Sequence, residues 1–334
     1  MSSSSTGSTV KLSIMMFLQF FIWGVWYVPM FPYLTGLGVE PGKIGFAYSM
    51  TGIAAMISPL LCWTHCRWFP SQVVLGVLHL IGGVLLYLCA TADNWNTFWP
   101  FLLLHLICYM PTLAMVNSVS FQNMEDPQKQ FPPVRTLGTI GWIVSGILLG
   151  SSFFDADGYR FSWPKFLLDP DADPSWIPLG ATKWPYYIGA GASVLLGMYS
   201  FILPHTPPKM KGQQISIGDV LGLKALRLMK DRSFATFIIC SFLICIPLSF
   251  YYQNANGFLQ AMDVPNSEGV MTLGQFSEIF FLLLVPFFLS QTGVKWMLII
   301  SLWRVGHSVT FCLQMAVPIP LFALRRGLTP RYLL

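Results

Sequence analysis

One carboxylate within a long apolar stretch carries the most distinctive chemistry of this sequence. Glu278 lies in the apolar stretch 274–290, and Gln275 precedes it by one helical turn, which places both side chains on one helix face. Hydrocarbon disfavours a charged carboxylate, so such a group can take up a proton near neutral pH. A proton-coupled carrier needs this chemistry. A structural glutamate paired with a buried arginine or a helix N-terminus would show the same pattern.

A second charged residue stands at the start of another apolar stretch. Arg135 precedes the stretch 137–154, Thr139 follows it by four residues and Trp142 by seven, so a helix presents all three on one face. The guanidinium and the hydroxyl offer hydrogen bonds, and the indole offers a flat stacking surface. This combination suits a small polar solute that contains a ring.

Polar residues in the other apolar stretches are weaker signals. Amide side chains could bind a polar solute or a neighbouring helix; they are Gln19, Asn117, Gln253, Asn254 and Asn256. For two isolated histidines, a hydrogen-bonded core position is preferred over a proton relay; they are His79 and His105. An aromatic cluster could stack on a flat solute or belong to an interfacial belt; it contains Trp23, Trp26 and Tyr27. Glycines expected to allow close helix packing are Gly82, Gly83, Gly138, Gly141 and Gly146.

These residues lie in a chain whose composition is that of a membrane protein. Its 334 residues are 54% hydrophobic and only 10% charged, whereas soluble domains carry about 25% charged residues. This excludes a cytosolic enzyme, a disordered chain and a secreted disulfide scaffold. The net charge of +5 is no nucleic-acid footprint, because the few basic residues lie between apolar stretches. The seven cysteines show no metal-ligand spacing.

Apolar stretches long enough to cross a bilayer, about 20 residues each, recur along the chain. Eight are clear, near 12–34, 44–64, 73–91, 97–118, 137–154, 185–203, 234–259 and 274–290, and a less regular ninth covers 296–323. With the N-terminus inside, eleven Lys and Arg residues fall in inner loops and four in outer loops. The positive-inside rule therefore predicts a cytoplasmic N-terminus.

Two loops differ from the rest. The stretch 155–184 is rich in Asp and Trp and falls outside; it lacks the glycine and closing glutamate of a calcium-binding loop, so we expect an ordinary solvated loop. The stretch 204–233 is basic, begins with prolines and falls inside. It has the position of a linker between two helical bundles, and its charge suits the cytoplasmic lipid surface.

Four short motifs resemble a known transporter family. They are FLQFFIWGVW at 17–26, YMPTL at 109–113, FPPVR at 131–135 running into GTIG at 138–141, and PFFLS at 286–290. Together they resemble the bacterial nucleoside:proton symporters of the major facilitator superfamily, from about residue 11 to 300. The resemblance implies an all-α fold with two six-helix bundles and alternating access. Here 1–203 would form the first bundle, 204–233 the linker and 234–300 a partial second bundle.

The resemblance also implies which residues bind the solute. Arg135, Thr139 and Gln275 would hydrogen-bond it, Trp142 would stack on its ring, and Glu278 would add a hydrogen bond and serve as the proton-coupling candidate. Tyr252 and Asn256 could line the wall formed by the seventh stretch. In that stretch the family carries a Gln and an Asn where this chain has Ser249 and Tyr252.

Two further segments depart from the family pattern. Residues 61–67 replace a glycine-rich loop that ends in Asp-Arg, and residues 301–334 form an atypical tail that breaks the positive-inside bias. Frameshifts in the underlying sequence would explain both, with a natural short variant as the alternative. At about 30–35 residues for each span and loop, 334 residues cannot hold twelve spans, so the second half is expected to be incomplete.

The sequence thus predicts a polytopic inner-membrane carrier that imports nucleosides or similar ring solutes, with the proton gradient as its driving force. We expect no cofactor, no metal, no catalytic site, no nucleic-acid partner, and a monomer in the lipid bilayer. A transport-incompetent truncated product is the main alternative. A carrier for another solute is less favoured, and so is a membrane-embedded enzyme, which would need more convergent titratable groups than Glu278 and Arg135.

Overall fold

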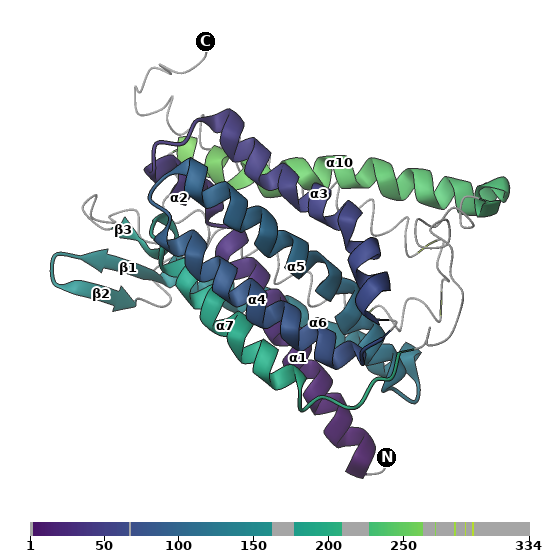
Figure 1. The fold of residues 1–334 in the computed structure, drawn as a ribbon. Coiled ribbons are helices and arrows are strands. Elements are labelled where there is room, and N and C mark those ends of the chain that lie inside the picture. The colour runs from purple at the N-terminus through teal and green to yellow at the C-terminus, as the bar shows by residue number, and fades with distance from the viewer. Residues whose placement is uncertain are drawn as a thin grey trace. The chain divides into compact units, whose positions relative to one another are not determined.

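The computed structural model describes residues 3–66, 68–161, 177–208 and 227–262, together with the single positions 271, 284, 291 and 296. The chain falls into two compact units, Met1–Ile279 and Phe280–Leu334. Nearly all described residues belong to the first unit, and Figure 1 shows its helices. They are α1 (Ser3–Tyr27), α2 (Met30–Gly36), α3 (Pro41–Cys66), α4 (Ser71–Thr91), α5 (Trp95–Gln122), α6 (Pro127–Ser151), α7 (Trp184–Ser200) and α10 (Arg232–Ala261).

Described helices overlap the first seven predicted spans, the first of which is divided into α1 and α2. Four described segments are long and apolar enough to cross a membrane, namely Gly7–Gly36, Ser71–Thr91, Trp95–Gln122 and Pro127–Ser151. The expected spans 274–290 and 296–323 lie outside the described residues, and the boundaries of the expected bundles and linker stay predictions.

Prolines divide the first span. Pro29 and Pro32 have no backbone N–H. They therefore cannot donate the usual helical hydrogen bonds to the carbonyls of Val25 and Val28, which lie four residues earlier. Helix α1 ends just before Val28, at Tyr27. The chain resumes as the short helix α2. Its last residues lead through Gly38, whose φ of 72° is left-handed, into α3.

Helix ends elsewhere follow ordinary capping rules. The Asn94 side chain accepts a hydrogen bond from the Thr97 N–H at 3.1 Å and begins α5. The Asp126 carboxylate accepts from the Lys129 N–H and begins α6, with Pro127 at the first helical position. The side-chain hydrogen bond with Lys129 also holds the pKa of Asp126 below its usual value. The Asp126 cap thus determines where α6, the helix that carries Arg135, begins.

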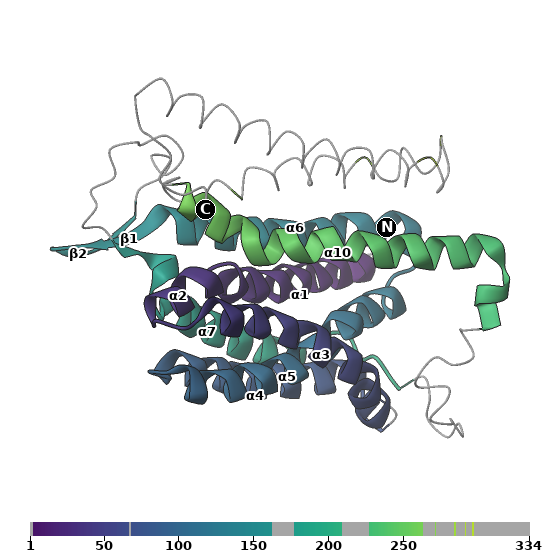
Figure 2. The same ribbon diagram turned by 90° about the horizontal axis from the view of Figure 1, so that it is seen from above.

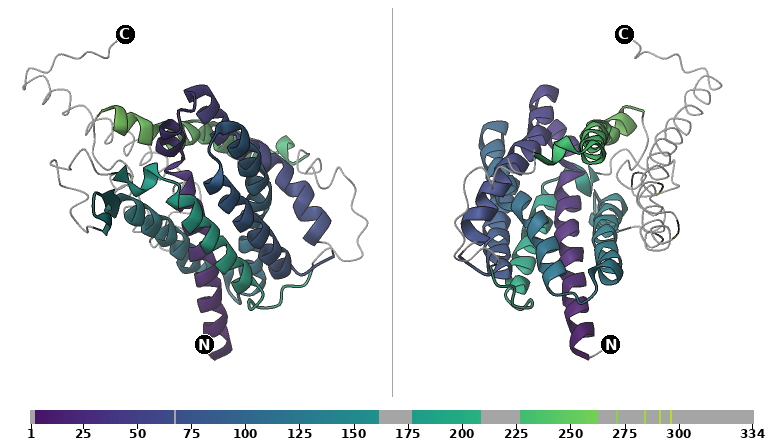
Figure 3. Two further views of the ribbon diagram at one scale, coloured as in Figure 1. Left: turned by 60° about the vertical axis from the view of Figure 1, so that its left-hand side comes forward. Right: turned by 90° about the vertical axis from the view of Figure 1, so that its right-hand side faces the viewer.

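The helices of the first unit pack in an order that differs from their order in the chain. Neighbours in space are α3 and α5, α5 and α4, α4 and α7, α7 and α1, and α1 and α6. Helix α1 therefore lies between α6 on one side and α7 on the other, as Figures 2 and 3 show. The N-terminal helix is thus a central element of the first unit.

A small antiparallel sheet is the departure from helix within the described residues. Strands β1 (Ser152–Asp155), β2 (Gly158–Phe161) and β3 (Ile177–Pro178) pair in the order β2-β1-β3. The turn between β1 and β2 needs Gly158, whose φ is 118°. The described ends of 155–184 thus include exposed strands, which were not predicted from the sequence, and residues 162–176 lie outside the description.

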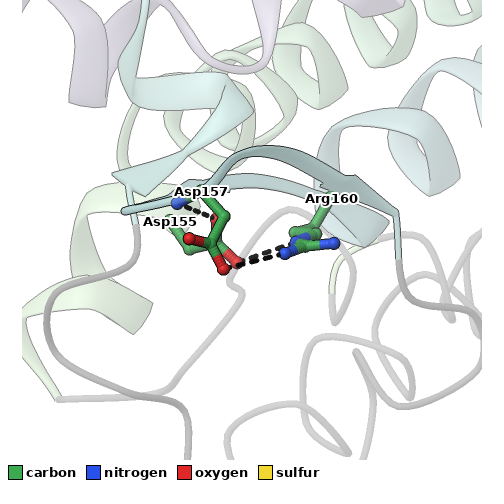
Figure 4. A network of polar contacts seen from close by, with 3 residues as sticks. All are labelled: Asp155, Asp157 and Arg160. Atoms are coloured by element: carbon green, nitrogen blue, oxygen red, sulfur yellow. Dashed lines mark hydrogen bonds and ion pairs between the residues drawn. The ribbon is translucent and has the colours of Figure 1, made fainter.

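Charged side chains fasten this hairpin. The Arg160 guanidinium donates to the Asp155 carboxylate at 2.9 Å and to Asp157 at 3.1 Å (Figure 4). The hydrogen bond from Arg160 holds the pKa of Asp155 below its usual value. Part of the acidic character of the segment 155–184 is thus neutralised within the segment itself.

Candidate functional site

Three of the predicted site residues lie on one face of α6. Arg135 Nη1 donates to Thr139 Oγ1 at 3.4 Å, as expected for side chains four residues apart. Thr139 is 3% exposed, whereas Arg135 and Trp142 are only half-buried. The structure therefore brings the cation and the hydroxyl together as the spacing predicts, with the indole one turn further along.

Helix α1 supplies aromatic partners to this face. The Arg135 guanidinium lies over the Phe20 ring, with its Cζ 4.1 Å from the ring centroid, which is a cation–π arrangement. The Trp23 and Trp142 rings meet edge to face, with centroids 5.8 Å apart. Phe20 and Trp23 are also half-buried. We call Phe20, Trp23, Arg135, Thr139 and Trp142 the α1–α6 cluster.

Glycines allow α1 and α6 to approach closely. A Cβ on Gly141 would overlap the Phe17 carbonyl oxygen, and a Cβ on Gly138 would lie 2.7 Å from the Phe20 ring. A Cβ on Gly24 would overlap the Ser145 hydroxyl. The prediction that Gly138 and Gly141 serve helix packing is confirmed. The close approach places Phe20 within reach of Arg135.

The other side of α1 carries a closed hydrogen-bond network. Thr112 donates to the Tyr109 carbonyl at 2.6 Å, so its oxygen accepts from Gln19 Nε2 at 2.8 Å. This orients the Gln19 amide, whose oxygen then accepts from His79 Nε2 at 2.8 Å. His79 Nδ1 lies 3.1 Å from the Ser193 hydroxyl. The network joins α1 to α4, α5 and α7, and it confirms His79 as a hydrogen-bonded core residue.

His105 occupies a related position in the same region. Its Nδ1 lies 2.9 Å from the Gly82 carbonyl, and its ring meets Trp26 edge to face at 5.3 Å. A Cβ on Gly83 would lie 2.9 Å from the Val194 side chain, so the expectation of close packing at Gly83 is also confirmed. The preferred core reading of His105 agrees with its complete burial.

Asn256 is buried at the break in the first span. Its amide donates to the Val28 carbonyl at 3.2 Å, the group that Pro32 leaves without a helical donor. The neighbouring Gly257 approaches α2 so closely that a Cβ would lie 2.7 Å from the Phe31 ring. The structure thus gives Asn256 a hydrogen bond between α10 and the break in the first span.

The remaining predicted site residues cannot be placed. Tyr252 belongs to α10, but its side chain is outside the described residues, and Gln275 and Glu278 lie in a segment outside the description. Their roles stay predictions. Within the part of the chain that the structure describes, no three His, Cys, Asp or Glu side chains could hold a metal ion together.

Comparison with known proteins decides the family. A family model described as "Nucleoside H+ symporter" matches residues 6–318. The chain belongs to this family. It is a family of transporters, so the membrane-enzyme alternative is not supported. The match extends past residue 300, where the resemblance seen in the sequence ends, and the frameshift explanation of 301–334 stays a prediction.

Individual family members share most of this chain. It is 44% identical over 296 residues to YegT of Escherichia coli (strain K12), described as a candidate nucleoside transporter, and this match covers 88% of the chain. It is 30% identical to the nucleoside permease NupG and to the xanthosine permease of the same organism, again over 88% of the chain. The chain spans 65% of the length of YegT and 68% of NupG.

A solved structure shows the same fold. The crystal structure of the nucleoside transporter NupG superimposes with a TM-score of 0.65 at 30% identity, covering 86% of this chain and 69% of that one. A mutant of the same transporter gives a TM-score of 0.68. The predicted fold class, an all-α polytopic membrane protein of the major facilitator type, is confirmed.

Sequence reasoning did not assign two features of the site. Phe20 was part of a quoted motif but had no role of its own, and Gln19 had two open readings. The signal for Phe20 was weak, because an aromatic residue in an apolar stretch is usual. A cation–π pair between Phe20 and Arg135 depends on helix packing, which spacing within one helix does not reveal.

Proposed function

We propose that the protein takes up nucleosides across the inner membrane together with protons. The observation that carries this proposal is the α1–α6 cluster, in a chain that belongs to the nucleoside H+ symporter family. A nucleoside combines a flat ring with carbonyl and hydroxyl oxygens. Arg135 and Thr139 offer donors to those oxygens, and Trp142 offers a ring surface.

The partial exposure of the cluster supports binding rather than packing alone. Arg135 is half-buried between the Phe20 ring and the Thr139 hydroxyl. A guanidinium presents its five N–H donors in a planar fork, a geometry that suits the carbonyl and hydroxyl oxygens of a solute. Holding the guanidinium over an aromatic ring also reduces the entropy lost when the solute binds.

Proton coupling is assigned to Glu278, with Gln275 one turn away. The family description supports coupling to protons. A carboxylate in an apolar stretch is the residue type that can bind and release a proton during a transport cycle. No cofactor beyond the proton gradient is part of the proposal, and neither is a second subunit.

The proposed orientation places the N-terminus in the cytoplasm. Four described helical segments suit a bilayer, which supports a multi-pass membrane protein. If the N-terminus is cytoplasmic, the inner loops carry eleven Lys and Arg residues and the outer loops carry four. This excess supports a cytoplasmic N-terminus. With this orientation α1 and α6 both begin at the cytoplasmic side, and the hairpin β1–β2 lies outside.

Uptake of labelled uridine tests the function. The chain is expressed in cells that lack their own nucleoside uptake, and its presence in the membrane is verified. We expect accumulation that unlabelled nucleosides compete for and that a protonophore abolishes. A Glu278→Gln variant should bind uridine but lose uphill, pH-dependent uptake.

Each other result has a defined meaning. If Glu278→Gln still drives uphill uptake, Glu278 is not the proton carrier. If the purified chain binds uridine but cells do not accumulate it, the transport-incompetent alternative holds. If the chain neither binds nor accumulates any of a panel of purine and pyrimidine nucleosides, the proposed function is wrong.

A further inference from the structure

The indole N–H of Trp23 has no hydrogen-bond acceptor among the described residues. Its Nε1 atom is buried. An indole N–H can only donate, and a buried donor without an acceptor is unfavourable. The Trp23 ring as a whole is only half-buried. A ligand that supplied an oxygen to this N–H would therefore gain a hydrogen bond that the protein itself does not make.

The surroundings of Trp23 place it between two helices that flank α1. Its ring centroid lies 5.8 Å from that of Trp142 on α6 and 6.1 Å from that of Tyr109 on α5. On its own helix, Phe20 lies one turn earlier with its ring 6.3 Å away and carries the Arg135 guanidinium. Trp23 thus borders the face where Arg135, Thr139 and Trp142 are proposed to hold the solute.

Trp26 provides an internal comparison on the same helix. Its indole Nε1 is also buried without a partner in the described part of the chain. Trp26, however, is 0% exposed and packs edge to face against His105, away from α6. An unmade bond alone therefore does not identify a ligand contact. Partial exposure and the contact with Trp142 distinguish Trp23.

The geometry points to Trp23 as a further solute-contacting residue, whose indole N–H donates to a carbonyl or hydroxyl oxygen of the bound nucleoside. This inference rests on the proposed function and extends it to α1. The N–H lies in the plane of the indole, so it donates at the ring edge and not at the ring face. Trp23 would then contribute to specificity, because it would favour solutes with a carbonyl or hydroxyl oxygen at the position of this N–H.

Binding of labelled uridine to the purified full chain in lipid nanodiscs tests the inference. Trp23→Phe keeps a flat apolar ring and removes the N–H, and Trp26→Phe makes the same change at the control position. We expect Trp23→Phe to raise the uridine Kd about three- to tenfold, the range for one hydrogen bond. Trp26→Phe should leave the Kd within about twofold of the wild type.

A series of uridine analogues shows whether the effect is a hydrogen bond. The series contains 2′-, 3′- and 5′-deoxyuridine, which each lack one hydroxyl, cytidine, in which an amino group replaces the C4 carbonyl, and 2-thiouridine, in which sulfur replaces the C2 oxygen. If Trp23 donates to one of these oxygens, the analogue without it should bind wild type and Trp23→Phe equally well. A general loss of packing would weaken every analogue by the same factor. If every carbonyl and hydroxyl change leaves the ratio of the two Kd values the same, the inference is wrong.

The outcomes separate the inference from the proposed function. If Trp23→Phe leaves the uridine Kd unchanged, the inference is wrong and the proposed function stands. The same holds if Trp23→Phe and Trp26→Phe weaken uridine binding equally. If the wild type binds no nucleoside, both are wrong. If Trp23→Phe does not fold, Trp23→Tyr provides the test, because its hydroxyl offers a donor at a different position. The relative affinities for the analogues should then change, and an unchanged order would overturn the inference.

Discussion

Helix α1 faces α4, α5 and α7 on one side and α6 on the other, and the two sides treat polar groups differently. Towards α4, α5 and α7, Gln19 is 0% exposed and its amide bonds to His79 and Thr112. Towards α6, Phe20 and Trp23 are half-buried beside the cation of Arg135. The first side fixes the position of α1 with closed hydrogen bonds. The second carries a guanidinium and aromatic rings that are only half-buried, and we propose that the solute binds there.

We infer from this difference that one side of α1 mainly stabilises the fold and the other side mainly binds the solute. A fully bonded buried network contributes to the folded state, and removing one member leaves its partners unsatisfied. A half-buried cluster contributes less to folding but offers donors to a ligand. Substitutions on the two sides should therefore change different measurements.

The largest effect is expected where α1 and α6 touch. In Gly141→Ala the new Cβ would overlap the Phe17 carbonyl oxygen, so the two helices must separate. Backbone displacement of this kind costs about 1–3 kcal/mol or more. We expect the yield of monodisperse protein after detergent extraction to fall severalfold. Gly191→Ala is the control, because a Cβ there meets no atom within 4 Å; equal yields for the two variants would contradict the close packing.

The next effect concerns the closed network. Gln19→Leu leaves the His79 Nε2–H without an acceptor, and Thr112 loses a donor. We expect a loss of about 1–3 kcal/mol in the free energy of unfolding, measured by thermal or denaturant unfolding in detergent. Gln122→Leu is the matched control, since among the described residues Gln122 bonds only within α5, to Ser118. A Gln19→Leu protein as stable as this control would show that the network is not needed for stability.

The smallest effect is expected in the hairpin, far in sequence from both sides of α1. Because Arg160 lowers the pKa of Asp155, the charged pair favours the folded hairpin above the ordinary Asp pKa of about 3.9. This contribution is lost as pH falls through the lowered pKa. Hydrogen exchange of 152–161, corrected for intrinsic rates, should show less protection at pH 3 than at pH 6. Arg160→Gln should remove most of this difference, and an unchanged difference would assign the pH dependence to other groups.

Features within one helix could be predicted from the sequence. The shared face of Arg135, Thr139 and Trp142 follows from helical periodicity, and the spans follow from apolar length. The turn at Asp157 and Gly158 had a recognisable Asp-Gly signal, but the acidic character of the segment dominated its interpretation. A resemblance to the family supplied the twelve-helix architecture, which composition alone does not specify.

Features that join distant helices could not be predicted in this way. Gln19 is hydrogen-bonded to Thr112, 93 residues away in the sequence, and to His79, 60 residues away. Phe20 contacts Arg135 because α1 packs on α6. Such pairs depend on which helices are neighbours and on how each is rotated. The role of Asn256 was open for the same reason, since its partner is a carbonyl made available by a proline in another helix.

The most direct test of the account measures stability and affinity on the same samples. Unfolding temperature and uridine Kd are determined for Arg135→Gln, which changes the α1–α6 cluster, and for Gln19→Leu, which changes the closed network. We predict that Arg135→Gln raises the Kd about tenfold or more with little change in unfolding temperature. Gln19→Leu should lower the unfolding temperature and leave the Kd within about threefold of the wild type. The reverse pattern, or equal effects of both variants on both quantities, would contradict the division of α1 into a structural side and a binding side.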